Sequence, residues 1–134
     1  RAAHIPWQLD DSYDALLPVM QTDITLTYGH QILIIDAKYY RRTIQTNYGV
    51  QTLHSGNLYQ IFTYVKNKEA QLSRTGYKVS GMLLYAKTNE ELVPDNVYQM
   101  SRNQISVKTL DLNQEFSEIE KQLKQIVKDH FGIE

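Results

Sequence analysis

The stretch that decides the fold is DITLTYGHQILIIDAK, from Asp23 to Lys38. Polar and apolar residues alternate over 23–28, Gly29 and His30 interrupt the pattern, and four apolar residues follow over 32–35. Alternation next to a short polar turn predicts a β-hairpin. The unbroken apolar run predicts that the second strand is covered on both faces and lies inside a sheet, away from its edges.

The turn of this hairpin also predicts which residues face each other. A two-residue loop at Gly29-His30 places Asp23 directly opposite Asp36. A four-residue loop keeps this pairing, whereas a three-residue loop breaks it. Because side chains alternate between the two faces of a strand, Asp23, Asp36 and Lys38 are expected on one face.

The two opposed carboxylates predict a metal site. Side chains opposite each other in an antiparallel pair lie roughly 5 Å apart, so the two charges repel by about 3 kcal/mol at an effective dielectric constant of about 20. A divalent cation removes this repulsion, and Lys38 adds an ammonium on the same face. Oxygen ligands without His or Cys favour Mg²⁺, or Mn²⁺ in its place. The alternative is a solvated polar face with an ordinary ion pair, but the interior strand favours the metal site.

The rest of the chain predicts two helices and two more strands. Apolar residues at helical spacing predict a helix over about 54–68, followed by a strand at about 78–86. Residues 87–103 are predicted to form a surface excursion, and alternation predicts a strand over 105–109. A last helix is expected from Phe116 to Phe131. A helix between strands indicates a crossover connection, so we expect a mixed α/β domain.

Further polar side chains are predicted near the acids. Gln60 and Tyr64 are one helical turn apart and flank the buried stripe of the first predicted helix. Two interpretations stay open for them: they edge the core, or they point into a cleft. Arg41 and Arg42 follow the hairpin and are placed either to contact phosphates or to lie in an ordinary solvated loop. The four histidines are scattered and lack metal-ligand spacing.

The composition is that of one folded domain without thiol chemistry. The 134 residues are 42% apolar and 22% charged, with a formal net charge of −1 and no cysteine. A chain without cysteine fits a reducing compartment, so we expect the cytoplasm. No apolar run approaches the roughly 20 residues that cross a bilayer, and no P-loop is present. We expect a single domain over residues 1–134, the C-terminal part of a longer chain, with no membrane span.

These residues together resemble a nuclease family. Asp23, the string DAK at 36–38 and the Gln60 to Tyr64 spacing resemble the PD-(D/E)xK core in its RecB-like form, which has a Q-x-x-x-Y helix. The longer strings TDI at 22–24, IIDAKYY at 34–40 and HSGNLYQ at 54–60 are similar to the C-terminal nuclease domain of the McrC family. McrC proteins are the cleaving subunits of McrBC-type modification-dependent restriction systems. The resemblance spans about residues 4 to 128.

The chain departs from the family pattern at two places. Thr22 stands where the family name has proline. The helix that usually opens the family core, before the hairpin, is expected to be missing from this chain. A third acidic ligand is therefore unassigned, and Asp10, Asp11 and Asp14 are weak candidates.

The resemblance implies a restriction-endonuclease-like sheet flanked by helices and metal-dependent hydrolysis of DNA phosphodiesters. Asp23, Asp36 and the carbonyl of Ala37 would bind Mg²⁺ or Mn²⁺. Lys38 would orient the attacking water or stabilise the developing charge. Gln60 would support the site, and Tyr64 would reach the substrate backbone.

The resemblance also implies a partner. In McrBC-type systems an AAA+ subunit, McrB, recognises modified cytosine and hydrolyses GTP, so we expect a McrB-like GTPase as the partner in antiviral defence. One alternative is a RecB-like nuclease of DNA repair or of another defence system. A further alternative is a non-cleaving DNA-binding or scaffold module that kept the fold.

Overall fold

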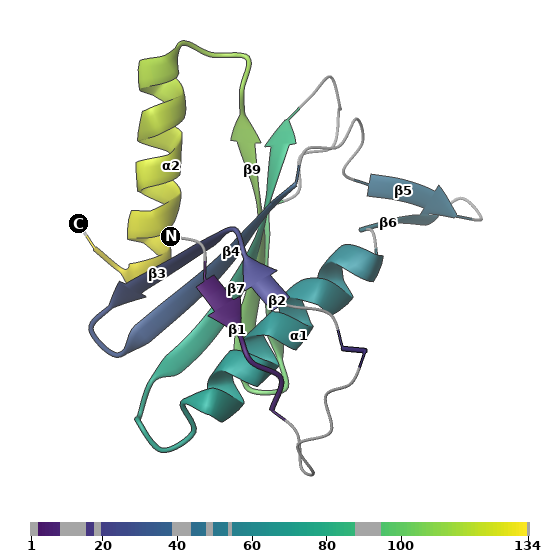
Figure 1. The fold of residues 1–134 in the computed structure, drawn as a ribbon. Helices are drawn as coiled ribbons and strands as arrows, with labels where there is room; N and C mark the ends of the chain where they lie inside the picture. Colours follow the sequence, from purple (N-terminus) through teal and green to yellow (C-terminus); the bar gives the residue numbers. More distant parts are fainter. Residues whose placement is uncertain are drawn as a thin grey trace.

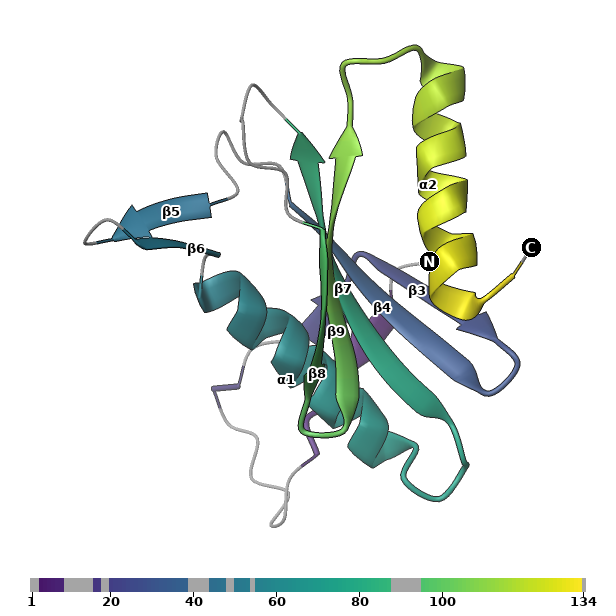
Figure 2. The same cartoon turned by 180° about the vertical axis from the view of Figure 1, so that it is seen from behind.

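The computed structural model describes residues 3–8, 16–17, 20–38, 44–47, 50–53, 55–87 and 95–133. Its centre is a five-stranded sheet with the strand order β3-β4-β7-β9-β8 (Figure 1). The strands of this sheet are β3 (Ile24–Tyr28), β4 (Gln31–Lys38), β7 (Lys78–Lys87), β8 (Asn96–Met100) and β9 (Asn103–Asp111). Helix α1 (Ser55–Gln71) covers one face and helix α2 (Phe116–Phe131) covers the other (Figure 2). This mixed α/β arrangement is the predicted fold class, and it is compatible with a restriction-endonuclease-like fold.

The β3–β4 hairpin has the predicted register. Tyr28 pairs with Gln31 across a two-residue loop, and the antiparallel ladder continues to Ile24 opposite Ile35. Gly29 takes φ +60° at the first loop position, a conformation that suits glycine and the type II′ turns of tight hairpins. The hairpin prediction is therefore confirmed, and Asp23 lies directly before the first paired residue.

Strand β4 lies inside the sheet, as its apolar run predicts. It pairs in parallel with β7 on the side away from β3, and α1 forms the crossover between the two strands. Alternate residues of β4 enter two separate cores: Ile34 belongs to the core under α1, and Leu33 and Ile35 to the core under α2. Asp36 has the same parity as Ile34, so its position belongs to the α1 face.

Helix α1 lies unusually close to β7 because the contact point is a glycine. A Cβ atom added to Gly81 would lie 2.7 Å from Cγ2 of Val65 and 2.8 Å from Cγ1 of Ile61. Both neighbours are fully buried side chains of α1. Gly81 therefore sets the distance between the helix and the sheet.

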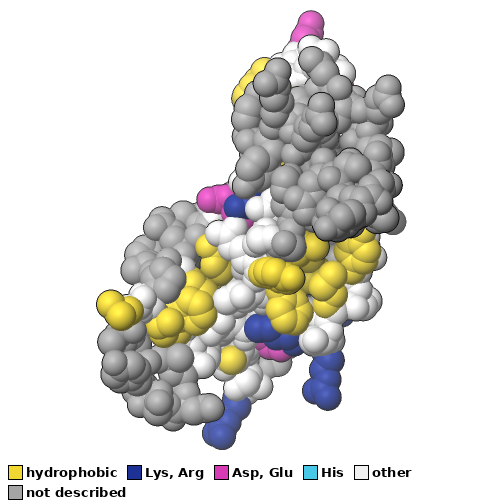
Figure 3. Space-filling model, turned by 90° about the vertical axis from the view of Figure 1, so that its right-hand side faces the viewer, with side chains coloured by type: hydrophobic (Ala, Val, Ile, Leu, Met, Phe, Trp, Pro, Cys, Tyr) yellow, Lys and Arg dark blue, Asp and Glu magenta, His cyan; other side chains and the backbone are white. Residues whose placement is uncertain are grey.

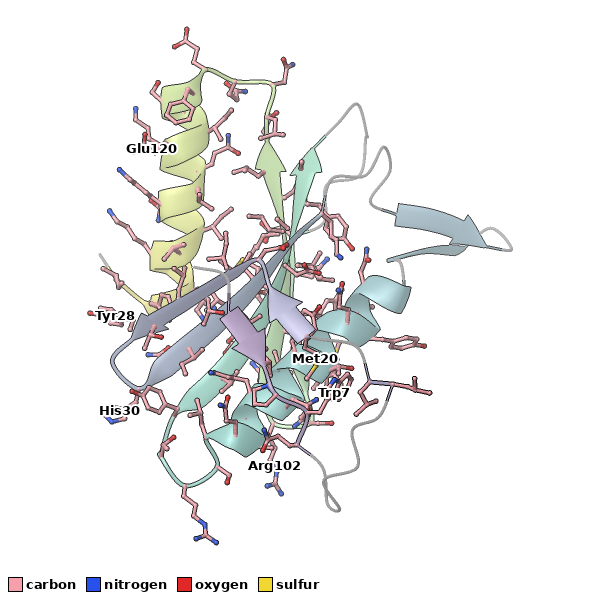
Figure 4. The ribbon with its side chains drawn as sticks, in the orientation of Figure 1. Trp7, Met20, Tyr28, His30, Arg102 and Glu120 are labelled. Atoms are coloured by element: carbon pink, nitrogen blue, oxygen red, sulfur yellow. The ribbon has the colours of Figure 1, made fainter. Side chains whose placement is uncertain are left out.

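The two short sheets outside the centre were not predicted. Strands β1 (Ala3–Ile5) and β2 (Met20–Thr22) pair with each other, and β5 (Ile44–Asn47) and β6 (Val50–Leu53) form a separate hairpin between β4 and α1. In Figure 4, Trp7 and Met20 lie on the α1 side of the sheet, where they contact the core under that helix.

The surface excursion predicted for residues 87–103 is wrong in part. Residues 96–100 form β8, an edge strand that pairs antiparallel with β9. Strand β9 also extends beyond the predicted 105–109, from Asn103 to Asp111. The side chains of β8 are mostly exposed, so no alternation marks the strand in the sequence.

Some apolar surface stays open to solvent. Figure 3 shows hydrophobic side chains gathered on the face that looks to the right in Figure 1. Among the large hydrophobic residues, Tyr59 of α1 is 70% exposed and Phe116 of α2 is 79% exposed. Neither α1 nor α2 is long and apolar enough to cross a membrane.

The stability of the fold should fall as the pH drops below about 6.5, because of His130 in α2. Burial lowers the pKa of His130 below its ordinary 6.5, and the ammonium groups of Lys108 and Lys78 lower it further. Below the ordinary pKa the unfolded chain binds a proton at His130 that the folded chain does not bind. The contribution of neutral His130 to the free energy of unfolding is therefore complete above the ordinary pKa and is lost on acidification. Thermal melting of wild type and of His130→Gln from about pH 7.5 to about pH 5 checks this. We expect a shallower fall in the variant; parallel curves would contradict the assignment.

Candidate active site

Asp23 binds the backbone of the strand opposite. Its Oδ2 accepts a hydrogen bond of 2.9 Å from the Ala37 amide of β4. Asp23 is an exposed residue at the start of the hairpin, and the register of β3 and β4 places it beside the end of β4. A carboxylate has about four acceptor sites, so this single bond leaves it able to accept others. The carboxylate of Asp23 is thus fixed at the end of β4.

Asp36 is the buried acid of the site. The residue is only 5% exposed, and its Oδ2 atom lies 2.9 Å from the Lys38 ammonium. This contact is an ion pair without the angles of a hydrogen bond, so Oδ2 has no hydrogen-bond donor among the residues that the structure describes. Buried carboxylate oxygens normally accept hydrogen bonds. The Lys38 ammonium is therefore the cation beside this oxygen, which has no hydrogen-bond donor in the described residues.

Burial and the neighbouring Asp23 both act on the ionisation of Asp36. Burial raises the pKa of Asp36 above its ordinary value, and the neighbouring Asp23 carboxylate raises it further, while Lys38 opposes both. The rise means that the surroundings favour the neutral acid over the carboxylate. A cation bound between Asp23 and Asp36 would reverse that preference.

Lys38 connects Asp36 to α1. Its Nζ donates a 2.7 Å hydrogen bond to Oε1 of Gln60, and Nε2 of Gln60 donates a 2.9 Å bond to the hydroxyl of Tyr64. Tyr64 is 9% exposed, and its ring belongs to the core under α1. The ring of Tyr64 thus edges the core, as one of the two interpretations expects, and its hydroxyl belongs to a polar network with Gln60 and Lys38. That the pair points into a cleft stays a prediction.

A second polar contact ties α1 to the sheet beside Lys38, and it was not assigned from the sequence. Nδ2 of Asn57 donates a 2.9 Å hydrogen bond to the hydroxyl of Tyr85, and both residues are buried. Tyr85 is the residue of β7 that pairs with Lys38. Asn57 lies one turn before Gln60, so this contact holds the first turns of α1 against β7 beside Lys38.

Removing the Tyr85 hydroxyl should loosen this attachment. Tyr85→Phe removes the hydroxyl that accepts a hydrogen bond from the buried Asn57 amide, and we expect a loss of about 1–3 kcal/mol in the free energy of unfolding. Urea denaturation followed by circular dichroism measures the loss. Tyr77→Phe is the matched control, because Tyr77 is a partly buried tyrosine outside the site. A loss no larger in Tyr85→Phe than in Tyr77→Phe would contradict the role of the hydroxyl.

The residues present fit a hard divalent cation. Asp23, directly before β3, and Asp36 of β4 offer carboxylate oxygens, and Oδ2 of Asp36 is buried without a hydrogen-bond donor in the described residues. Mg²⁺ and Mn²⁺ prefer oxygen ligands of this kind. The described parts of the chain hold no cluster of three acidic or histidine side chains. The third protein ligand that the family resemblance implies is the carbonyl of Ala37.

The comparison with known proteins relates this chain to a restriction system. Over 131 residues, the chain is 30% identical to the type IV methyl-directed restriction enzyme EcoKMcrBC of Escherichia coli strain K12. The chain is related to a McrBC-type restriction enzyme. The match covers 96% of the chain and 36% of the E. coli protein, so the chain spans little more than a third of this relative. No protein-family model matches the chain.

Several residues that the sequence places near the site lie outside the described ranges. Arg41 and Arg42, the candidate phosphate contacts, are among them. The candidates for a third acid also lie outside the described ranges; these are Asp10, Asp11 and Asp14. The structure thus brings together five of the predicted site residues with Ala37. These are Asp23, Asp36, Lys38, Gln60 and Tyr64.

Proposed function

We propose that this chain is the nuclease part of a McrBC-type modification-dependent restriction system and cleaves DNA by metal-dependent phosphodiester hydrolysis. The observation that carries the proposal is the arrangement of Asp23, Asp36 and Lys38 at the end of β4, with a buried carboxylate oxygen that lacks a hydrogen-bond donor in the described residues. The similarity to EcoKMcrBC supports the system to which the chain is assigned.

The proposed cofactor is Mg²⁺, for which Mn²⁺ can substitute. Asp23, Asp36 and the carbonyl of Ala37 would hold the ion. When bound, the ion lowers the pKa of a water and neutralises charge on the phosphate. The protein contributes a fixed pair of acids. The Ala37 amide donates a hydrogen bond to the carboxylate of Asp23, and the side chain of Asp36 is buried.

Lys38 is proposed to stabilise the negative charge that develops on the phosphate, or to orient the attacking water. Its ammonium is held between Asp36 at 2.9 Å and Gln60 at 2.7 Å, so its position beside the acids is fixed before substrate binds. Charge held in place in this way stabilises a transition state without further reorganisation. Gln60 positions the ammonium, and Tyr64 positions Gln60.

DNA and a partner subunit complete the proposal. The chain has a net charge of −1, so long-range attraction to DNA is not built into its composition. We propose that Arg41 and Arg42 contact phosphates beside the cleaved bond. A McrB-like AAA+ GTPase in the cytoplasm would recognise the modified base and deliver the DNA. The name of the E. coli relative, a methyl-directed enzyme, supports methylated DNA as the substrate.

A cleavage assay with the full natural protein and its GTPase partner tests the proposal. We expect cutting of methylated DNA in Mg²⁺ and none in EDTA. Lys38→Gln should abolish cutting, whereas Lys121→Gln should not, because Lys121 is an exposed lysine that pairs only with Glu118 among the described residues. Equal cutting by the Lys38→Gln variant, or cutting in EDTA, would overturn the proposal.

A further inference from the structure

We propose that the β5–β6 hairpin is a DNA-contacting ribbon that enters the major groove beside the cleaved bond. This inference rests on the proposed function, because it assumes that DNA is the substrate at the end of β4. It adds a second contact surface, separate from the acids and from Lys38.

The place of the hairpin in the chain ties it to the site. It begins shortly after Lys38 at the end of β4 and ends just before Ser55 at the start of α1. Its two strands pair with each other and form a sheet of their own, apart from the central sheet. Figures 1 and 2 show the ribbon projecting from the body beyond the first turn of α1. DNA held at the end of β4 would therefore lie within reach of it.

The charge of the surrounding segment favours a polyanion. From Ala37 to Lys68 the chain has five Lys or Arg residues and no Asp or Glu, a net charge of +5. The rest of the chain has nine Lys or Arg and fifteen Asp or Glu, a net charge of −6. The overall value of −1 thus conceals one basic segment, which includes the hairpin, the last two residues of β4 and most of α1. A basic segment of this kind is the electrostatic signature of nucleic-acid binding.

The dimensions and residue types of the ribbon favour the major groove. Each strand has four residues, which gives a ribbon about 13 Å long with strands about 4.8 Å apart. The major groove is about 12 Å wide and admits a two-stranded ribbon, whereas the minor groove is only about 6 Å wide. The strand sequences IQTN and VQTL contain amide and hydroxyl residues without a charge. These residue types bond to base edges in the major groove.

The test adds negative charge to the ribbon without changing its size. Gln45 and Gln51 belong to neighbouring rungs of the β5–β6 ladder, one on each strand, so substituting both adds one acid to each strand. The variant Gln45→Glu/Gln51→Glu is compared with Gln71→Glu/Gln99→Glu, which carries the same charge change. Gln71 ends α1, and Gln99 lies on the edge strand β8, which β7 and β9 separate from the strand of Lys38.

Binding of a fluorescent DNA duplex, methylated or unmethylated, is measured by anisotropy in EDTA on the full natural protein. We expect the ribbon variant to lose at least about fivefold in affinity at low salt, and we expect this loss to shrink as salt rises, because salt screens the repulsion between the added acids and the phosphates. The control variant should bind like wild type, and both should melt like wild type. Equal affinity of the ribbon variant and the control would overturn the inference. So would a ribbon variant that fails to assemble with its partner subunit but binds DNA normally, since the ribbon would then be a protein contact.

These results separate the inference from the proposed function. If wild type binds DNA but cuts nothing in Mg²⁺, the proposed function fails and the binding data alone decide the role of the ribbon. If wild type cuts DNA and the ribbon variant binds as well as the control, the nuclease proposal stands and the ribbon inference fails.

Discussion

Asp36→Asn should abolish DNA cleavage and leave the fold at least as stable as the wild type. The substitution keeps the shape of the side chain and removes the charge that would hold the metal. Transition-state stabilisation by a metal ion is worth several kcal/mol, so we expect cutting to fall by at least about a hundredfold. Stability should not fall, because the raised pKa of Asp36 shows that its surroundings favour a neutral group.

The control for this prediction is an ion pair away from the site. Asp95 forms a 2.6 Å ion pair with Lys108 of β9, so Asp95→Asn also removes the carboxylate partner of a lysine. The two variants are compared with wild type by cleavage rate and by thermal melting at neutral pH. Cutting at the wild-type rate by Asp36→Asn would remove the acid from the mechanism. A large drop in its melting temperature would show that Asp36 serves the fold instead.

Gly81→Ala should damage the fold and the site together. The new methyl group would lie less than 3 Å from the buried side chains of Val65 and Ile61, so α1 has to move away from β7. Overpacking of this kind costs about 1–3 kcal/mol. The same displacement would separate Gln60 from Lys38, whose ammonium it positions at 2.7 Å. We therefore expect lower stability and slower cleavage in one variant.

Gly56→Ala is the matched control for Gly81→Ala. Gly56 lies in the first turn of the same helix, and an added Cβ there meets no atom within 4 Å. Alanine favours a helix over glycine by up to about 1 kcal/mol, so this variant should be as stable as wild type or more stable. Urea denaturation of both variants measures the difference. Equal stability of the two would contradict the close approach of α1 at Gly81.

The parts of the fold that sequence predicts are those set by local pattern. The β3–β4 hairpin follows from alternation and from the two-residue loop at Gly29-His30. Strand β8 was missed because its turn has no such signal. Ser101 and Arg102 take φ values of 46° and 74° without a glycine between the strands. Two positive φ values in a tight turn normally require Gly or Asn, so the sequence gives no sign of this hairpin.

The site is predictable up to the point where it depends on distant pairing. Asp23 and Asp36 lie on one hairpin, so local register brings them together, and the spacing of Gln60 and Tyr64 places them on one side of a helix. The contact of Asn57 with Tyr85 depends on the parallel register of β4 and β7 and on the close approach of α1. Neither follows from the local pattern of residues, so Tyr85 was not assigned.

The most direct test of the site is metal binding by wild type and by Asp23→Asn. Asparagine keeps an oxygen that can accept the hydrogen bond from the Ala37 amide, so the end of the hairpin is preserved while the charge is lost. Binding to the folded state alone raises the melting temperature. We predict that Mg²⁺ and Mn²⁺ raise the melting temperature of wild type and leave that of Asp23→Asn unchanged. No rise in wild type, or an equal rise in both proteins, would contradict a metal site between Asp23 and Asp36.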